Sequence, residues 1–339
     1  MKRVGNIYHK IYEKDNIRQA ILSASQGKRH KRGVMKVFEN IDKAIDLVHD
    51  ILKNKTYIPN PYWESVLVDG ASKKERIIYK PKFFPDQVIH WCLMNIIKPQ
   101  VVRGMYKWSC ASIPSRGTLY AKKATEKWIR TDHANTRYAL KIDIKKYYPN
   151  INKETLKSKF RRIIKDPDVL WLLDIIIDSH HLGIPIGNYT SQWFANFYLQ
   201  DLDHYIKQNL GATYYVRYMD DMVIFGSNKK KLRKDKILIE KFLENESLTI
   251  KENWQVFNID KRPLDFVGYV FKRDKTYVRK RITARMRKKH LRFERQPTKH
   301  LACSMMSYLG WLMHSDSYIL YKKYFKNIKL MKEFIKHEN

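Results

Sequence analysis

A pair of aspartates between two apolar runs constrains this chain more than any other feature. Residues 213–226 read TYYVRYMDDMVIFG, in which Asp220 and Asp221 interrupt residues that are mostly β-branched or aromatic. That pattern predicts a strand, a tight turn and a second strand, with both carboxylates at the turn. Because a buried carboxylate has to be paired or metal-bound, the hairpin predicts a site for chemistry.

A third aspartate occupies a similar setting upstream. Residues 138–144 (YALKIDI) alternate and become β-branched at their end, which predicts a strand that carries Asp143. A strand end that meets solvent is the alternative for this residue taken alone. Asp143, Asp220 and Asp221 together would supply the hard oxygen ligands that hold two Mg²⁺ ions roughly 3.5–4 Å apart for phosphoryl transfer, with Mn²⁺ able to substitute.

The net charge predicts the kind of partner. The chain has 67 Lys and Arg against 34 Asp and Glu, a formal net charge of +33. An excess of this size requires an anionic partner, and we expect nucleic acid rather than membrane because neither end has a basic segment with a clean apolar face. Basic residues concentrate in 1–36 and in 272–300. In the second segment Tyr277 and Phe293 interleave with them, as in helices that track a phosphate backbone.

Other kinds of site and location are disfavoured. Cys92, Cys110 and Cys303 are odd in number and lack CxxC spacing, so we expect neither a disulfide framework nor a zinc site. His180 and His181 lack a third ligand at a suitable spacing. With no signal peptide at the start and no run of about 18 apolar residues, we expect a cytoplasmic protein without a membrane segment.

Local patterns predict the neighbouring elements. Apolar residues at three- and four-residue steps predict an amphipathic helix over 37–55. A β-hairpin is expected to follow, with its turn at Asp69 and Gly70, and Asp86 is expected to cap the next helix. The further helices are expected over 86–97, 118–132 and 190–207.

Six segments, in this order, resemble the motifs of the reverse transcriptase family. They are KERIIYKP (74–81), KIDIKKYYPNI (141–151), GIPIGNYTSQWFANFYLQDLD (183–203), YMDDMVIF (218–225), LTIKENW (248–254) and DFVGYVF (265–271). The resemblance implies an α+β, right-hand polymerase fold with fingers, a palm built on an antiparallel sheet, and a helical thumb. It also implies an RNA-directed DNA polymerase whose partners are template RNA and a primer extended as cDNA.

The resemblance suggests domain boundaries as well. We expect a basic N-terminal extension at 1–36, fingers with part of the palm at 37–137, the palm at 138–271 and a basic helical thumb at 272–339. At this length we expect no RNase H, maturase or endonuclease domain after the thumb.

Site roles are implied at the matched positions. The catalytic metal ions would be held at Asp143, Ile144, Asp220 and Asp221. The incoming nucleotide would meet Arg76, Lys80, Tyr147, Tyr148, Ile186, Gly187 and Lys251. Primer and template would meet Met219, Phe266, Gly268, Tyr269, Arg285, Arg287, Lys288 and Lys289.

Some of these assignments carry a chemical expectation. Tyr148, in preference to Tyr147, would pack under the sugar and reject a 2′-hydroxyl by shape. Lys251 would donate a proton to the leaving pyrophosphate, with a plain surface lysine as the alternative. Gly268 would let the nucleic-acid backbone approach closely, and the backbone amides of 144–148 would face the triphosphate.

Three shorter sequence motifs resemble one branch of the family. The form IGNxTSQxFAN, GKRHKR at 27–32 and SYLGWLMHSDSY at 307–318 are similar to reverse transcriptases of bacterial and phage diversity-generating retroelements. Ile186 stands where most relatives have Gln, and CASIPSRGT (110–118) departs from the usual basic stretch. This branch implies cDNA synthesis from a template-repeat RNA with errors at adenines, for mutagenic retrohoming, and an accessory variability determinant protein that forms an oligomer.

Two alternatives stay open. The chain could serve a retron, a group II intron-like element or an abortive-infection system, or it could be a non-catalytic RNA-binding scaffold. Intact Asp143, Asp220 and Asp221 argue against the scaffold, because a scaffold has no reason to keep unpaired acids. The IGNxTSQ motif argues against most of the retron, group II intron-like and abortive-infection alternatives.

Overall fold

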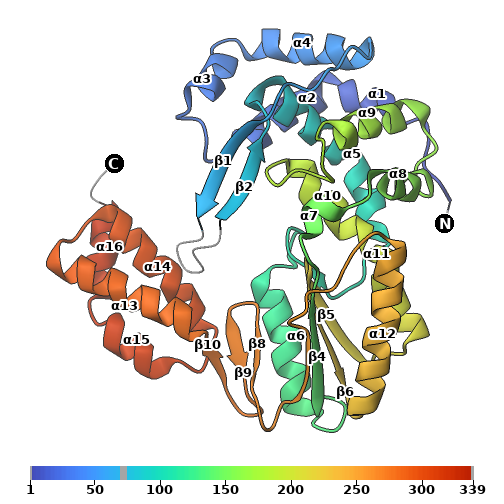
Figure 1. Cartoon of the computed structure of the whole chain (residues 1–339). Helices are drawn as coiled ribbons and strands as arrows, with labels where there is room; N and C mark the ends of the chain where they lie inside the picture. Colours follow the sequence, from blue (N-terminus) through green and yellow to red (C-terminus); the bar gives the residue numbers. More distant parts are fainter. Residues whose placement is uncertain (1, 69–74, 337–339) are drawn as a thin grey trace.

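The computed structural model describes residues 2–68 and 75–336 (Figure 1). Its centre is a five-stranded sheet with the strand order β3-β5-β6-β4-β7, in which all neighbours are antiparallel except β3 and β5. Helix α6 (Thr118–Thr131) packs against β3 and β5, and α12 (Lys229–Asn245) packs against β4, β6 and β7. The strands are β3 (Ser109–Cys110), β4 (Tyr138–Asp143), β5 (Tyr214–Tyr218), β6 (Asp221–Gly226) and β7 (Gln255–Asn258).

The register of this sheet brings the three aspartates to one end. β5 and β6 form the predicted hairpin, with Met219 and Asp220 as its turn. Asp221 is the first residue of β6 rather than part of the turn, and it pairs with Tyr218 on one side and with Asp143 on the other. Antiparallel pairing thus places Asp143 beside Asp221, with Asp220 next to them in the turn.

A helical layer covers the end of the sheet that carries the aspartates (Figure 1). Its core includes Val88, Leu93 and Ile97 of α5, all fully buried. The elements of this layer are α1 (Tyr8–Tyr12), α2 (Lys14–Ala24), α3 (Arg32–Glu39), α4 (Ile41–Lys53), η1 (Phe83–Gln87), α5 (Val88–Arg103), α7 (Tyr147–Asn150), α8 (Lys153–Arg161), α9 (Pro167–Asp178) and α10 (Tyr189–Tyr198). α11 (Gln200–His204) and η2 (Tyr205–Asn209) continue the chain after α10, and α11 contacts α12.

A two-stranded hairpin projects from this layer (Figure 1). β1 (Trp63–Val68) and β2 (Glu75–Lys80) pair antiparallel, with Val66 opposite Ile77. The predicted turn at Asp69 and Gly70 lies outside the described residues. Most side chains of both strands are exposed, so the hairpin contributes little to the core.

A second small sheet leads into a C-terminal helical bundle. β8 (Leu264–Phe266), β9 (Tyr269–Phe271) and β10 (Thr276–Val278) pair antiparallel in the order β10-β9-β8. A second hydrophobic core joins this region to the central sheet, because Trp128 and Val223 belong to the same buried cluster as Phe266 and Leu312. The bundle consists of α13 (Lys280–Arg295), α14 (Lys299–Met313), α15 (Tyr318–Tyr324) and α16 (Ile328–Lys336).

The helix predictions are confirmed in part. The helix predicted over 118–132 is α6, but the one predicted over 37–55 is two helices. Asn40 separates them and caps α4, since its side-chain oxygen accepts from the Lys43 amide at 3.1 Å. The helix predicted over 190–207 is also interrupted, at Leu199, and continues as α11 and η2.

The prediction that Asp86 caps a helix is wrong. Its carboxylate is buried and accepts hydrogen bonds from the Tyr57 hydroxyl at 3.0 Å and the Asn60 amide at 3.3 Å. Burial raises the pKa of this carboxyl above its ordinary value. Asp86 therefore ties the segment before β1 to the start of α5, which runs from Val88 to Arg103.

Three further expectations concern membrane segments, cysteines and domain boundaries. No helix within residues 2–68 and 75–336 has the length and hydrophobicity to cross a membrane. All three cysteines are free. The domain boundaries at 36, 137 and 271 stay predictions.

Asp166 fastens the N-terminal segment to α9. One carboxylate oxygen accepts from the amides of Ile7 at 2.7 Å and Tyr8 at 3.1 Å. The other accepts from Asp168 at 3.1 Å and Val169 at 3.3 Å, which caps α9. Burial alone would raise the pKa of Asp166, but these four N–H donors outweigh it and hold that pKa below its ordinary value.

We expect Asp166→Ala to lower the free energy of unfolding by about 1–3 kcal/mol at pH 7, because it leaves buried N–H donors without an acceptor. A carboxyl group whose pKa is depressed in the folded state stabilises the fold fully above its unfolded-state pKa of about 3.9. The difference in free energy of unfolding between the variant and the wild type should therefore shrink as the pH falls from that value through the lower pKa of the folded state. Urea unfolding at several pH values measures it. Asp168→Ala is the control, since its ion pair with Lys55 is exposed and should cost under about 1 kcal/mol. Equal losses in both variants would contradict the role given to Asp166.

Candidate active site

A pocket of about 830 Å³ opens at the aspartate end of the central sheet. Its lining comes from β2, the β4–α7 junction, the 186–188 loop with the start of α10, and the 251–253 loop. Lys80, at the end of β2, is exposed and lies outside this lining. The pocket gathers eight residues predicted from the sequence for metal or nucleotide binding: Arg76, Ile144, Tyr147, Tyr148, Ile186, Gly187, Asp220 and Lys251.

Asp143, Asp220 and Asp221 form a carboxylate cluster beside this pocket. Burial, and then the charge of Asp143, raises the pKa of Asp220 above its ordinary value. Burial raises the pKa of Asp221 to about 7, against the opposing effect of Lys141. Both shifts come mainly from burial and then from the neighbouring carboxylates, and a bound cation would relieve that repulsion.

Two lysines contact the carboxylate cluster. Lys251 forms an ion pair with Asp143, and its backbone N–H donates to the Asp143 carbonyl at 2.8 Å. Lys141 Nζ lies 3.6 Å from Asp221 Oδ2 and donates to the Asp265 carbonyl at 2.7 Å. Lys251 is predicted from the sequence and Lys141 is not, although alternation along β4 puts Lys141 on the same face as Asp143.

The donors of the carboxylate cluster fit a divalent cation. Carboxylate oxygens are the ligands that Mg²⁺ and Mn²⁺ prefer, and Asp221 Oδ1 is buried without a hydrogen-bond partner in the described part of the chain. Among those residues, no three His, Cys, Asp or Glu side chains converge closely enough to hold a metal ion as they stand. Lys251 already engages Asp143, so a cation bound here would compete with it for that carboxylate.

The two tyrosines after β4 have different surroundings. Tyr147 is buried and its hydroxyl donates to the Ala195 carbonyl at 2.5 Å, which makes it a core residue. Tyr148 is half-buried; burial raises its pKa, the charge of Asp220 adds to this, and Arg76 opposes it. Tyr148 thus feels the charge of both Asp220 and Arg76, and its packing under the sugar stays a prediction.

The amides around this junction are partly used within the fold. The N–H of Ile144 donates to the Asp220 carbonyl at 3.3 Å, and that of Lys145 donates to the Thr249 carbonyl at 2.8 Å. The prediction that the backbone amides of 144–148 face a phosphate is therefore wrong for the amides of Ile144 and Lys145. Lys146 has a left-handed backbone (φ 45°), and α7 begins immediately after it, so the first N–H groups of that helix lack intrahelical acceptors.

The Ile186–Gly187 loop is joined to β2. The Tyr79 N–H donates to the Ile186 carbonyl at 2.8 Å. Gly187 has a φ of +137°, and an added Cβ would lie 2.1 Å from the Tyr79 carbonyl oxygen, so only glycine permits this approach. The contact holds Arg76, three residues earlier on β2, against the same pocket.

The residues predicted for primer contact fall into two groups. Met219 lies in the hairpin turn next to Asp220, with a positive φ of 55°. Phe266 and Tyr269 are buried, and an added Cβ on Gly268 would lie 2.6 Å from a Trp311 ring carbon. Gly268 therefore makes room for α14 instead of a nucleic-acid backbone, and burial argues against primer contact by the side chains of Phe266 and Tyr269.

The basic residues predicted on α13 do not share one face. Successive residues turn by about 100° around an α-helix, so Arg285, Lys288 and Lys289 fall in one sector with Arg292. Arg287 falls on another side, where its Nε donates to the Tyr324 hydroxyl at 3.1 Å and holds it against α15. A phosphate-facing side of α13 would thus include Arg292 in place of Arg287.

The histidine pair has a structural role. His180 Nδ1 lies 2.7 Å from the Leu182 carbonyl, and its ring centroid lies 4.2 Å from that of Tyr79 on β2. The His181 ring lies 4.4 Å from His180. These contacts pack the 179–182 loop against the β1–β2 hairpin.

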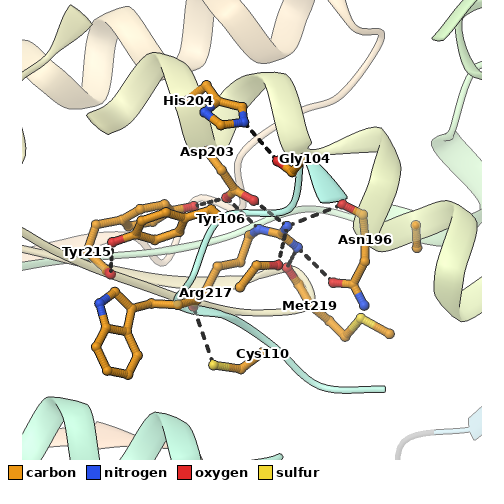
Figure 2. Close-up of polar contacts among 12 residues, drawn as sticks. Gly104, Tyr106, Cys110, Asn196, Asp203, His204, Tyr215, Arg217 and Met219 are labelled. Atoms are coloured by element: carbon orange, nitrogen blue, oxygen red, sulfur yellow. Dashed lines mark hydrogen bonds and ion pairs between the residues drawn. The ribbon is translucent and has the colours of Figure 1, made fainter. Parts of the chain in front are cut away.

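Sequence patterns missed one buried group near the site. Arg217 on β5 is fully buried and forms an ion pair with Asp203 on α11, with Nη2 2.6 Å from Oδ2 (Figure 2). The signal was present in the sequence, because a charged residue between Val216 and Tyr218 interrupts an otherwise apolar strand. Such a residue needs a buried partner, which the sequence does not identify.

Comparison with known proteins gives the family and the fold. A family model described as reverse transcriptase (RNA-dependent DNA polymerase) matches residues 84–271. The chain is 24% identical over 212 residues to Retron Ec73 reverse transcriptase of Escherichia coli, covering 58% of this chain and 63% of that protein. It is 26% identical over 177 residues to group II intron-encoded protein LtrA of Lactococcus lactis subsp. cremoris, covering 49% of this chain and 29% of that protein. The chain thus spans less than two thirds of the length of either relative.

A solved structure is similar in fold. The telomerase of Candida albicans, determined in complex with a fragment of telomeric RNA, superposes with a TM-score of 0.54 at 12% identity, over 83% of this chain and 55% of that one. With mixed helices and sheets in this arrangement, the chain has the α+β right-hand polymerase fold. The family match covers more than half of the chain, and this protein therefore belongs to the reverse transcriptase (RNA-dependent DNA polymerase) family.

Proposed function

We propose that this protein is an RNA-directed DNA polymerase that extends a primer on template RNA. The observation that carries the proposal is the carboxylate cluster beside a pocket that also holds Arg76, Tyr148 and Lys251. A pocket of this size, with cations facing acids across it, suits a nucleoside triphosphate and its metal ions. Working on RNA and nucleotides of the cell, the enzyme would act in the cytoplasm.

We assign the metal ligands to Asp143, Asp220 and Asp221, with the Ile144 backbone beside them. Two Mg²⁺ ions, or Mn²⁺ in their place, would supply polarisation of the primer 3′-hydroxyl and stabilisation of the pyrophosphate when bound. The unpartnered Asp221 Oδ1 and the raised carboxyl pKa values support this assignment.

The cations of the pocket would serve the triphosphate. Arg76 offers a planar fork of donors from the hairpin side, opposite the carboxylates. Lys251 would protonate the leaving pyrophosphate, for which it has to leave its ion pair with Asp143. Tyr148 would lie under the sugar, and Ile186 and Gly187 would line the nucleotide from the side joined to β2.

Asp143→Asn and Asp220→Asn should each lower primer extension on RNA by at least about 10²-fold, because a neutral amide cannot hold a dication. The assay uses the purified chain, a DNA primer on an RNA template, dNTPs and Mg²⁺. Glu252→Gln is a matched control, since it removes a carboxylate from the same pocket but outside the cluster. Near-wild-type extension by either aspartate variant would overturn these assignments.

The basic surface of α13 would hold the template and primer. Arg285, Lys288, Lys289 and Arg292 share a sector of this helix, and each phosphate contact releases counterions. The slope of log K against log salt therefore reports how many of them touch phosphate.

Changing Arg285, Lys288, Lys289 and Arg292 together to Gln should flatten that slope by about three units for a labelled RNA–DNA duplex. The matched control removes the same charge from exposed positions of α12, namely Lys230, Arg233, Lys234 and Lys241. This control variant should change the slope by less than about one unit, because α12 packs on strands β4, β6 and β7, away from α13. The same flattening in both variants would assign the effect to net charge and not to α13.

For the biological system, we propose a diversity-generating retroelement. The IGNxTSQxFAN wording and Ile186 support this branch, whose members copy a template-repeat RNA with errors at adenines. It would bring an oligomeric accessory variability determinant protein as a further partner. The second candidate is a retron or a group II intron, and the likeness to Retron Ec73 reverse transcriptase and to LtrA supports that alternative.

Ile186 is half-buried in the pocket lining and its side chain can neither donate nor accept a hydrogen bond, so nucleotide selection should rest more on base-pair strength. Sequenced cDNA from the wild type should show errors concentrated at template adenines, and Ile186→Gln should make fewer of them. Ile186→Val keeps the apolar character and should keep the wild-type spectrum. An even spectrum in the wild type would favour the retron-like alternative, whereas an unchanged Ile186→Gln spectrum would overturn only the role of Ile186.

A further inference from the structure

Arg217 is the hub of a buried polar network beneath the hairpin turn (Figure 2). Its guanidinium forms a two-pronged ion pair with Asp203, with Nε 2.7 Å from Oδ1 and Nη2 2.6 Å from Oδ2. Nη2 also donates to the Ser109 hydroxyl at 2.7 Å, and Nη1 donates to the Asn196 side-chain oxygen at 3.1 Å. The side chains of Arg217 and Asp203 are 0% and 1% exposed, so water does not substitute for these partners.

The same guanidinium holds the turn that carries Asp220. Its Nη1 donates to the Met219 carbonyl at 3.0 Å, and the Met219 N–H donates to the Cys110 carbonyl at 3.3 Å. Met219 has a φ of 55°, a left-handed conformation that side-chain-bearing residues disfavour. Such a conformation persists where its surroundings impose it, and here both polar backbone groups of Met219 are fixed.

The network also reaches another wall of the pocket. Asn196 belongs to α10, whose first turn contributes Ser191 and Gln192 to the pocket lining. Its side-chain Nδ2 donates to the Ala111 carbonyl at 2.9 Å. One planar, rigid group thus connects α10, the segment after β3 and the hairpin turn.

We propose that Arg217 is a positioning residue that fixes the Asp220 carboxylate relative to α10 through the Met219 carbonyl. This rests on the proposed polymerase function. Stability alone does not require a buried guanidinium here, because an apolar pair of similar volume could replace Arg217 and Asp203 without loss of stability. The guanidinium is required at the hairpin turn. An apolar pair could not donate a hydrogen bond to Met219, and Asp203 is the counter-ion that allows a guanidinium to be buried there.

Arg217→Lys tests the geometry, because lysine keeps the charge for Asp203 but cannot span Asp203, Asn196 and the Met219 carbonyl at once. In the full chain we expect kcat for primer extension to fall roughly 10- to 100-fold. The KM for dNTP should change by less than about threefold, because Arg76 and Lys251 are untouched. Mn²⁺ titrated alone, with free Mn²⁺ measured by electron paramagnetic resonance, should bind the variant more weakly than the wild type.

Two further variants separate positioning from stability. Ser109→Ala removes a contact of the same guanidinium away from the turn, and it should keep kcat within about threefold of wild type even if the melting temperature falls. The double variant Arg217→Met with Asp203→Asn leaves no buried charge unpaired and no side-chain donor at position 217 for the Met219 carbonyl, so it guards against misfolding of the lysine variant; it should lose kcat as Arg217→Lys does.

A folded Arg217 variant with wild-type kcat and Mn²⁺ affinity would overturn the proposal. So would an equal loss of kcat in Ser109→Ala, which would reduce Arg217 to a stabilising residue. A wild type that binds Mn²⁺ but extends no primer would refute the polymerase function instead, and the Mn²⁺ affinities of the variants would then still decide whether Arg217 positions the cluster.

Discussion

Like charges held side by side repel, and this constraint shapes the centre of the molecule. Strand pairing sets Asp143 directly opposite Asp221, with Asp220 in the adjoining turn. Carboxylates opposed across a ladder destabilise a sheet unless cations stand near them. Lys251 and Lys141 supply positive charge beside these carboxylates, and Arg217 donates to the carbonyl of the turn from beneath. The strand register, these two lysines and Arg217 together fix where the three carboxylates lie.

The rest of the pocket is assembled around this cluster by backbone contacts. The Tyr79–Ile186 hydrogen bond and the side-chain-free Gly187 attach the β1–β2 hairpin to the loop before α10. Arg76 is thereby held in the pocket by a strand whose own side chains are mostly exposed. A hairpin with little core of its own depends on such attachments for its position, so the β2 side of the pocket rests on a few hydrogen bonds and the Tyr79–His180 ring contact.

The sequence predicted what local periodicity and ordered motifs can report. Alternation placed Asp143 at the end of a strand and found the β5–β6 hairpin, because both faces of those strands are set by burial. Local sequence patterns could not predict interaction partners that are distant in the chain. Nothing near Asp86 indicates that Tyr57 will bind it, and nothing near Arg217 indicates that Asp203 will be its partner. Motif resemblance located Phe266, Gly268 and Tyr269, but whether those side chains face a ligand or the core depends on α14, which packs on them from outside the motif.

The second hydrophobic core has a consequence for how this protein can be divided. The family match ends at residue 271, but Trp128 and Phe266 inside it share one buried cluster with Leu312 and Phe325 outside it. The first core likewise includes Ile17 and Leu52, which precede residue 84. The stretch 84–271 that matches the family model is therefore not a unit of folding by itself. An exchange of residues 84–271 alone would separate both cores of this chain from part of their own packing, whereas an exchange that includes the flanking helices would keep each core whole.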